Sequence, residues 1–302
     1  MKYFFVSDLH GCRLELLKFY LDAKGFNPEV DTLVVVGDIV DRGFHTMDLV
    51  RYVNSLPHVI RLWGNHDRRT RDIILGIGDH PQHYDVSNGV PATLHSICNF
   101  SHPASGLVNA HKIETIWYYL HGLIPGNPTA KENIVEFVDK YCSQCAWAIE
   151  WPHLIATHGW LPYEKRFKRL SDSIDQIEWQ LCRPLQDLSG LSVEDWVDAT
   201  WADTMACFKH KLFVDKTMLV GHWWAADMRA RLAQHQTLDQ AIKLRTVDYS
   251  MYYNEAHDVI FIDPFVQSSY TINVYVYDTD EEPQVYVTEG KSVVKKPLSA
   301  WN

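Results

Sequence analysis

Short apolar runs alternate with helical patterns over the first 65 residues, and this alternation constrains the fold more than any other feature of the chain. Residues 3–6, 33–36 and 59–62 have the length and the apolar content of buried strands. Between them, residues 14–21 and 47–53 carry apolar side chains at the spacing of one helix face. The order strand, helix, strand, helix, strand predicts a mostly parallel sheet with right-handed crossovers.

The pattern changes along the rest of the chain. Residues 112–121 and 131–149 predict helices, whereas residues 154–157 and 217–220 are two further short apolar strands. From residue 259 to about residue 290 the apolar period becomes two, which predicts antiparallel strands near the C-terminus.

The sequence contains no repeat, low-complexity segment or clear linker, which favours a single domain over residues 1–302. Residues 79–150 are then an insertion that begins with a stretch rich in Gly, Pro, His, Ser and Asn. We consider two roles for this insertion, a lid over a binding site and a solvated decoration.

Composition excludes several classes of protein. The chain has 46% hydrophobic and 22% charged residues, which is ordinary for a globular protein and excludes a disordered one. With 28 Lys and Arg against 38 Asp and Glu, its formal charge of −10 predicts no stable nucleic-acid partner. No apolar stretch approaches the roughly 20 residues of a membrane span, and the first charge after the initial apolar run is Asp8. We therefore expect a soluble, cytoplasmic protein with no membrane partner.

The six cysteines are expected to be reduced thiols, because the chain shows no export signal. Cys142 and Cys145 have the spacing of a redox or zinc pair, but no second pair completes a zinc site. Their helical surroundings favour buried thiols.

Each of the five apolar strands is followed by side chains suited to binding a metal ion or a phosphate. Ligands bind outside the carboxyl ends of the strands in open α/β sheets, so we expect these side chains to meet at one edge. Carboxylate, imidazole and amide donors without thiolates suit Mn²⁺, Fe or Zn²⁺, and one bridging carboxylate can hold two ions about 3.5–4 Å apart. In chain order these residues are Asp8, His10, Asp38, Asp41, Arg42, Asn65, His66, His158 and His222.

The same motifs carry a resemblance to a known family. The runs 7–11, 37–43 and 64–67, with His158-Gly159 and Gly221-His222, resemble those of the calcineurin-like metallophosphoesterases. Within that superfamily the chain is similar to the phosphoprotein phosphatases and to the bacterial symmetric diadenosine tetraphosphate hydrolases. The resemblance implies an α/β/β/α sandwich in which two mixed sheets are flanked by helices, with helical insertions. It also implies an enzyme that hydrolyses phosphoesters with two divalent metal ions, of which Mn²⁺ is favoured and Fe and Zn²⁺ are alternatives.

The resemblance also implies a role for each residue. Asp8 and His10 would bind the first metal ion, Asp38 would bridge, and Asn65, His158 and His222 would bind the second. His66 would be the general acid, Asp41 its orienting carboxylate, and Arg42 a clamp for the phosphate. These roles agree with the chemistry of the side chains, since imidazole can protonate a leaving oxygen and guanidinium offers a planar fork to phosphate.

The substrate is open between alternatives. Asp41 in the run 38–43 is typical of protein phosphatases, which favours a serine/threonine-type protein phosphatase acting on phosphomonoesters of a protein or peptide. Asp67 and the run Gly221-His222-Trp223 are instead typical of the tetraphosphate hydrolases, so a symmetric dinucleoside polyphosphate hydrolase is the alternative, with a small phosphoester or nucleotide as substrate. A catalytically inactive binding scaffold is disfavoured, because every ligand position is filled.

Several arginines are further candidates for phosphate binding. Arg68, Arg69 and Arg71 follow the Asn65-His66 motif and either extend a phosphate-binding rim or form a solvated helix face, which we favour. The second phosphate-binding arginine of the protein phosphatases is not found near residues 200–203, and neither Arg183 nor Arg229 has support from a motif.

Overall fold

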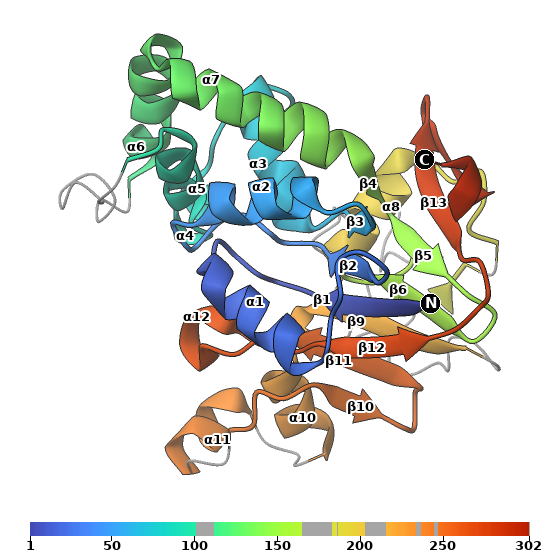
Figure 1. Cartoon of the computed structure of the whole chain (residues 1–302). Coiled ribbons are helices and arrows are strands. Elements are labelled where there is room, and N and C mark those ends of the chain that lie inside the picture. The colour runs from blue at the N-terminus through green and yellow to red at the C-terminus, as the bar shows by residue number, and fades with distance from the viewer. Residues whose placement is uncertain are drawn as a thin grey trace. The chain divides into compact units, whose positions relative to one another are not determined.

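The computed structural model describes residues 1–100, 112–164, 183–185, 187–202, 216–233, 237–244 and 247–301. These residues divide into two compact units. The first unit comprises residues 1–145 and 265–279, and the second comprises residues 146–264 and 280–302. Each unit has its own mixed sheet, and we describe the units separately (Figure 1). The single domain over residues 1–302 stays a prediction.

The sheet of the first unit contains the three strands that the sequence predicts within the first 65 residues, β1, β2 and β3. Its order is β12-β1-β2-β3-β4, with β1, β2 and β3 mutually parallel and β12 antiparallel to β1. All five residues of β2 are buried, as expected of a parallel strand that is covered on both faces. The bounds are β1 Lys2–Val6, β2 Thr32–Val36, β3 Val59–Leu62, β4 Cys145–Ala146 and β12 Tyr275–Asp278.

Helices follow the first three strands, and the first two of these helices are the ones that the sequence predicts. Helix α2 buries the apolar face that its sequence spacing indicates, including Met47, Val50 and Val53. Helix α3 begins directly after β3 and ends at Gly76, whose left-handed conformation (φ 65°) is common at a helix C-terminus. The bounds are α1 Leu14–Ala23, α2 Thr46–Ser55, α3 Asn65–Leu75 and, next to β12, α12 Val266–Ser269.

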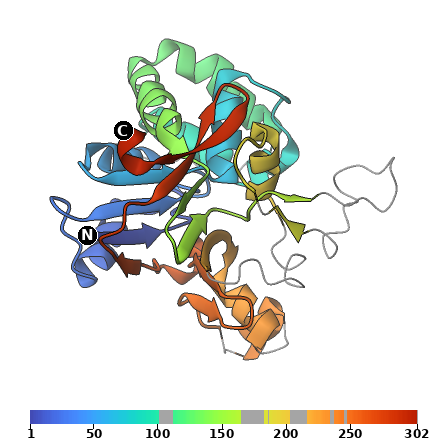
Figure 2. The ribbon, with the colours of Figure 1, turned by 90° about the vertical axis from the view of Figure 1, so that its right-hand side faces the viewer.

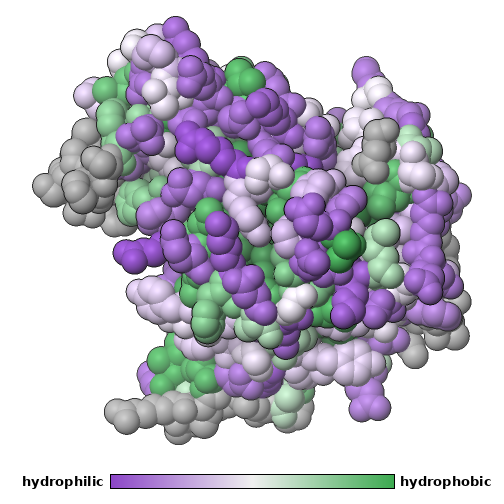
Figure 3. Space-filling view, viewed as in Figure 1, coloured by the Kyte–Doolittle hydropathy of each residue, from purple (hydrophilic) through white to green (hydrophobic). Residues whose placement is uncertain are grey.

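A second group of helices packs against α2 and α3 in the first unit. Every residue of α5 is buried, and Ser96 Oγ of α5 accepts the Met47 N–H of α2 at 3.0 Å. Lys131 of α7 and Asp139 of η3 are exposed, whereas Phe137 of η3 is fully buried. The surface in this view is largely hydrophilic, with smaller hydrophobic patches (Figure 3). The bounds are α4 His83–Ser87, α5 Val90–Ile97, α6 Ile113–Trp117, η1 Tyr118–Leu123, η2 Ile124–Gly126, α7 Pro128–Ile134, η3 Val135–Tyr141 and η4 Cys142–Gln144.

The prediction of a helix over residues 131–149 is wrong at its C-terminal end. The helical segment ends at Gln144, and residues 145–146 and 148–150 form strands β4 and β5. Ala148 and Ile149 of β5 are fully buried between two partner strands, so pairing within the sheet overrides the local helical pattern.

The sheet of the second unit has the order β10-β11-β9-β6-β5-β13-β14, with β6, β9 and β11 mutually parallel. The hairpin of β13 and β14 is antiparallel (red in Figure 2); β13 lies in the predicted antiparallel stretch, whereas β14 lies beyond its end. Strand β11 differs from the prediction of an antiparallel strand, because it lies inside the sheet and pairs parallel with β9 and antiparallel with β10. An apolar period of two indicates a strand but not the direction of its neighbours. The bounds are β5 Ala148–Glu150, β6 Leu154–Thr157, β9 Thr217–Trp224, β10 Tyr252–Asn254, β11 Val259–Asp263, β13 Gln284–Glu289 and β14 Ser292–Pro297.

The remaining described elements of the second unit are short. They are β7 Tyr163–Glu164, β8 Arg183–Pro184, α8 Val193–Thr200, α10 Ala225–Ala233, α11 Leu238–Leu244 and η7 Leu298–Ala300. None of the helices described in either unit combines the length and apolar composition needed to cross a membrane. The predicted α/β fold with two mixed sheets is confirmed.

Candidate metal centre

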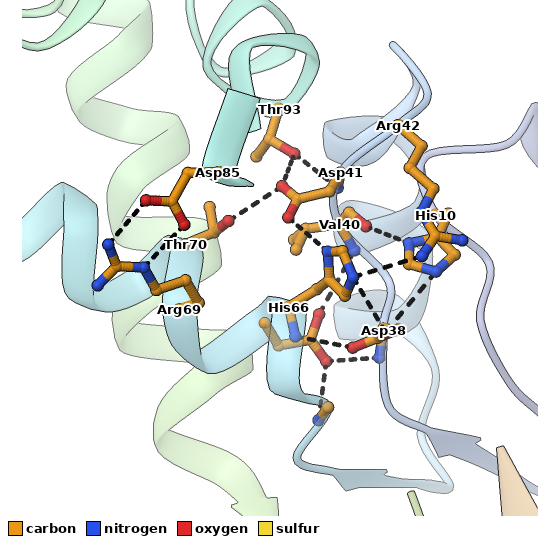
Figure 4. Close-up of polar contacts among 12 residues, drawn as sticks. His10, Asp38, Val40, Asp41, Arg42, His66, Arg69, Thr70, Asp85 and Thr93 are labelled. Atoms are coloured by element: carbon orange, nitrogen blue, oxygen red, sulfur yellow. Dashed lines mark hydrogen bonds and ion pairs between the residues drawn. The ribbon is translucent and has the colours of Figure 1, made fainter. Parts of the chain in front are cut away.

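The ends of β1, β2 and β3 bring carboxylates and imidazoles together in the first unit (Figure 4). His10 Nε2 lies 3.7 Å from Asp8 Oδ1 and 3.7 Å from Asp38 Oδ2. His66 Nε2 lies 3.9 Å from the same oxygen of Asp38. One ligand atom each from His10, Asp38 and His66 lies within 4.8 Å of the other two. Oxygen and nitrogen donors at these distances can hold a divalent ion.

His10 has the geometry of a metal ligand. Its Nδ1 atom lies 2.9 Å from the carbonyl oxygen of Val40 and so carries the ring proton. Its Nε2 atom is buried, has no hydrogen-bond partner among the described residues, and faces Asp8 and Asp38. Burial, with a smaller effect of Arg42, holds the pKa of His10 well below its ordinary value. A neutral imidazole fixed by a backbone carbonyl and offering a lone pair beside two carboxylates fits a divalent cation.

The backbone at this edge adopts a conformation that residues with a Cβ atom rarely take. Asp8 (φ 53°), His10 (φ 43°), Asp38 (φ 56°), Asp41 (φ 71°) and Arg42 (φ 64°) are all left-handed. Each such residue costs about 1–3 kcal/mol unless the surroundings compensate, and such strain is concentrated at functional sites.

Asp67 compensates for the strain at Asp38. Its carboxylate accepts the N–H groups of Asp38 at 2.8 Å, Ile39 at 2.9 Å and Gly64 at 3.2 Å. Sequence reasoning used Asp67 as a marker of the tetraphosphate hydrolases but gave it no structural role. The signal that could have found it is an acidic residue in the first turn of α3, where a carboxylate often accepts backbone N–H groups.

Gly64 is required at its position by space. A Cβ atom on Gly64 would lie 2.1 Å from Asp38 Oδ1 and 2.3 Å from the Asp38 nitrogen. The next residues complete the turn, because Asn65 is buried at the first position of α3 and the N–H of His66 donates to Asp38 Oδ1 at 3.0 Å. The chain between β3 and α3 therefore holds the Asp38 carboxylate from one side.

Asp41 and His66 form a buried pair, with His66 Nδ1 2.8 Å from Asp41 Oδ2. Burial acts to lower the pKa of His66, but the charges of Asp38 and Asp41 outweigh it, so the pKa lies above its ordinary value. Burial raises the pKa of Asp41, opposed by His66 and by two threonine hydroxyls. On the other side of the ring, Arg42 Nη2 lies 3.5 Å from His66 Nε2.

In the second unit, His158 and His222 are brought together. His158 directly follows β6, His222 lies within the neighbouring parallel strand β9, and their ring centroids are 5.2 Å apart. His158 is fully buried and His222 is left-handed (φ 59°). Gly159 permits the close packing after β6, since a Cβ atom there would lie 2.5 Å from the carbonyl oxygen of Thr200.

Arg69 has neither of the roles considered for it. It donates from Nε and Nη2 to the two carboxylate oxygens of Asp85 at 2.8 and 2.7 Å, and Asp85 is fully buried. Arg69 therefore fastens α4 to α3 and is no part of a phosphate rim or a solvated face (Figure 4). Arg68 and Arg71 pair with Asp72 on the same helix, as expected of a helix face.

Arg229, a further arginine candidate, is engaged within the second unit and is not free to bind a phosphate. Arg229 donates to the carbonyl oxygens of Asp248 and Met251, both at 2.8 Å, and its guanidinium lies over the ring of Tyr252. The side chain of Arg183 and the residues from 203 to 215 lie outside the described part of the chain.

Cys142 and Cys145 are buried free thiols, as predicted, and burial raises the pKa of both well above the ordinary value. Two of the other cysteines, Cys182 and Cys207, lie outside the described residues.

Comparison with known proteins agrees with the geometry of the first unit. A model of the calcineurin-like phosphoesterases matches residues 1–223. The chain belongs to the calcineurin-like phosphoesterase family. The predictions of this family and of a phosphoester-hydrolysing enzyme are thereby confirmed, and the carboxylates and imidazoles brought together in the first unit suit the metal-dependent chemistry of such phosphoesterases.

Among curated relatives, the phosphoesterase is similar to enzymes named symmetrical bis(5'-nucleosyl)-tetraphosphatase. It is 40% identical over 79 residues to the enzyme of Erwinia tasmaniensis, which is 26% of this chain and 28% of the relative. It is 42% identical over 78 residues to that of Pectobacterium carotovorum, which is 26% of this chain and 27% of the relative. The match thus spans between a quarter and a third of these relatives.

Two solved phosphatase structures are similar to the phosphoesterase over almost its whole length. A cold-active protein-tyrosine phosphatase of a Shewanella species is 12% identical, with 98% of this chain and 80% of that chain covered and a TM-score of 0.44. A protein serine/threonine phosphatase of Saccharomyces cerevisiae is 11% identical, with 97% and 82% covered and a TM-score of 0.40.

Proposed function

We propose that this phosphoesterase hydrolyses dinucleoside polyphosphates symmetrically, at a centre of two divalent metal ions. The observation that carries the proposal is the 40–42% identity with bacterial enzymes named for that reaction. The family match extends well beyond that stretch, to residue 223, and includes every residue of the predicted centre. We thus rank the dinucleoside polyphosphate above the phosphoprotein substrate, which is the reverse of the preference from the sequence.

The proposed metal ligands are those of the sequence analysis. The carboxylates and the neutral His10 of the first unit, and the paired imidazoles of the second, are donors suited to Mn²⁺, with Fe and Zn²⁺ as alternatives. When bound, two such ions neutralise phosphate charge and supply an activated water. We assign Asp8 and His10 to the first ion, Asp38 to both, and Asn65, His158 and His222 to the second.

The remaining residues handle the substrate and a proton. Arg42 Nη2 and His66 Nε2 lie 3.5 Å apart, so that one phosphate group can contact both. Arg42 binds and orients the phosphate through its planar fork. His66 gives the proton from Nε2 to the leaving oxygen, and Asp41 holds the ring through Nδ1 and stabilises its charged form.

A second candidate substrate, the phosphomonoester of a protein, is favoured by the Asp41–His66 pair. A serine or threonine alkoxide is a poor leaving group and needs a proton, whereas the phosphate leaving group of a dinucleoside polyphosphate needs it much less. The pair protonates either kind of leaving oxygen, so it keeps this candidate open without excluding the first.

A substrate panel separates the two candidates. Purified protein with Mn²⁺ is offered diadenosine tetraphosphate, a phosphoserine peptide and p-nitrophenyl phosphate. We expect kcat/KM for the dinucleotide to exceed that for the peptide at least about tenfold, a difference of about 1.4 kcal/mol in transition-state binding. Two molecules of ADP should be the product. A higher value for the peptide would favour the second candidate, and production of ATP and AMP would exclude symmetric cleavage.

A further inference from the structure

We propose that Thr93 is a positioning residue for the Asp41–His66 pair, supplied by the segment that the sequence predicts to be an insertion. The inference goes beyond the proposed substrate, and it rests on the proposed role of His66 as the proton donor. The hydroxyl of Thr93 holds Asp41 in the orientation in which the Asp41 carboxylate pairs with His66.

The hydroxyl of Thr93 makes two hydrogen bonds to the same residue. Its Oγ1 atom accepts the N–H of Asp41 at 2.7 Å and donates to Asp41 Oδ1 at 3.0 Å. Thr70 Oγ1 donates to the same oxygen at 3.0 Å. Two donors thus hold Oδ1, which leaves Oδ2 directed at His66 Nδ1 (Figure 4). All these groups are buried, so water does not replace a lost donor.

Helix α5 presents this hydroxyl from a rigid position. Thr93 lies in its middle and is fully buried. Gly89, directly before α5, packs closely against the backbone of Arg42. A Cβ atom on Gly89 would lie 2.2 Å from the Arg42 nitrogen. Asp41 and Arg42 are both left-handed, so their backbone needs such outside support. A carboxylate held by a fixed hydroxyl is what precise orientation of a proton donor requires.

The experiment compares Thr93→Val, which removes the hydroxyl at similar volume, with Thr93→Ser, which keeps it. The control is Ser96→Ala, one turn further along α5, whose hydroxyl bonds to Met47 and makes no recorded contact with Asp41. Each Mn²⁺-loaded protein is assayed on an alkyl phosphate, a poor leaving group, and on p-nitrophenyl phosphate, a good one. Bound metal is measured in each.

We expect Thr93→Val to lower kcat on the alkyl phosphate by about tenfold or more and on p-nitrophenyl phosphate distinctly less, with unchanged metal content. Thr93→Ser should restore both rates to within about threefold. Ser96→Ala should leave the ratio of the two rates unchanged, because it loosens α5 without touching the pair. Equal losses on both substrates, or no rescue by serine, would overturn the proposal.

A second readout does not depend on turnover. In ¹⁵N-histidine spectra of the Zn²⁺-loaded protein, the Nδ1–H signal of His66 should shift or broaden in Thr93→Val and return in Thr93→Ser. An unchanged signal in the valine variant would overturn the positioning role. If the wild type hydrolyses no phosphoester, the proposed function fails and these spectra alone decide the role of Thr93. If the valine variant does not fold, Thr93→Ala removes the same hydroxyl and is read in the same way.

Discussion

The carboxylate of Asp67 holds the backbone of Asp38, whose N–H it accepts at 2.8 Å through Oδ2. Asp38 is left-handed (φ 56°), and its carboxylate lies within 4 Å of both His10 and His66. By accepting the N–H groups of Asp38 and Ile39, Asp67 determines where the Asp38 carboxylate lies. The position of the central metal-ligand candidate thus depends on an acid 29 residues further along the chain.

Asp67→Asn should lower the free energy of unfolding by about 1–3 kcal/mol, because one accepting oxygen becomes an NH₂ group that faces buried N–H donors. Urea unfolding in the presence of a chelator measures the loss apart from metal binding. Asp72→Asn, on the same helix and paired with the partly exposed Arg68 and Arg71, is the matched control and should cost less than about 1 kcal/mol. Equal stabilities of wild type and Asp67→Asn would show that these hydrogen bonds contribute nothing.

Gly64→Ala should displace the Asp38 carboxylate, since the added Cβ atom would lie 2.1 Å from Asp38 Oδ1. The backbone of Gly64 (φ −94°, ψ 158°) suits alanine, so the effect is one of space alone. We expect metal content and turnover to fall together, turnover by about tenfold or more. Gly76→Ala meets no atom within 4 Å and is strained only by its φ of 65°, so it should cost stability without loss of metal. Full metal content in Gly64→Ala would contradict this account.

Asp38→Asn should abolish turnover and reduce bound metal while the fold survives, because the amide cannot neutralise two cations. Metal analysis by mass spectrometry, with circular dichroism as the test of folding, checks this. Asp48→Asn on α2, with 54% of its side chain exposed, should retain all its metal. Two-metal occupancy and normal rates in Asp38→Asn would remove Asp38 from the site.

His66→Asn should leave metal content intact and slow substrates according to their leaving group. A phosphoserine peptide should lose about 10²–10⁴-fold in rate, the usual size of general acid catalysis, and p-nitrophenyl phosphate distinctly less. Asp41→Asn should give the same pattern more weakly, since it disturbs only the orientation and charge of the ring. Loss of metal from His66→Asn, or equal losses on the two substrates, would give His66 another role.

Glu150 should stabilise the second unit in a pH-dependent way. Burial acts to raise its pKa, but hydrogen bonds from Lys216, Lys295 and Tyr286 outweigh it and hold the pKa below the ordinary value. Because the pKa is lower in the folded state, the stabilisation is present above the pKa of the unfolded chain and is lost as pH falls through the folded value.

Glu150→Gln should therefore cost about 1–3 kcal/mol of unfolding free energy at pH 7, and the difference from wild type should shrink in acid. Unfolding curves across pH measure it. Glu289→Gln is the control, because the ion pair of Glu289 with Lys296 is half exposed. It should lower the unfolding free energy by less than about 1 kcal/mol. If the difference in unfolding free energy between wild type and Glu150→Gln does not change with pH, the charge of Glu150 does not stabilise the second unit.

Local pattern was sufficient for strands β1, β2 and β3, and it indicated the candidate ligands that follow them. Residues 33–36 are apolar without interruption because β2 is buried on both faces, and Asp38 follows because a strand end at a sheet edge is where a polar side chain can face a ligand. The predictions of a helix over 131–149 and of an antiparallel β11 were wrong in part. In each case the strand's partner, β13 for β5 and β9 for β11, lies far away in the sequence.

The sequence by itself determined the family, the α/β class and the identity of the candidate metal ligands, because each of these is encoded by residues within a few positions of an apolar strand. Only the tertiary structure decided what holds those ligands in place. The hydroxyl of Thr93 meets Asp41 across 52 positions, the carboxylate of Asp67 meets Asp38 across 29, and Arg69 is bound to a buried acid. The local spacing of residues cannot predict such contacts. They form because the packing of helices α3 and α5 buries these polar groups, and a buried donor or acceptor is almost always hydrogen-bonded.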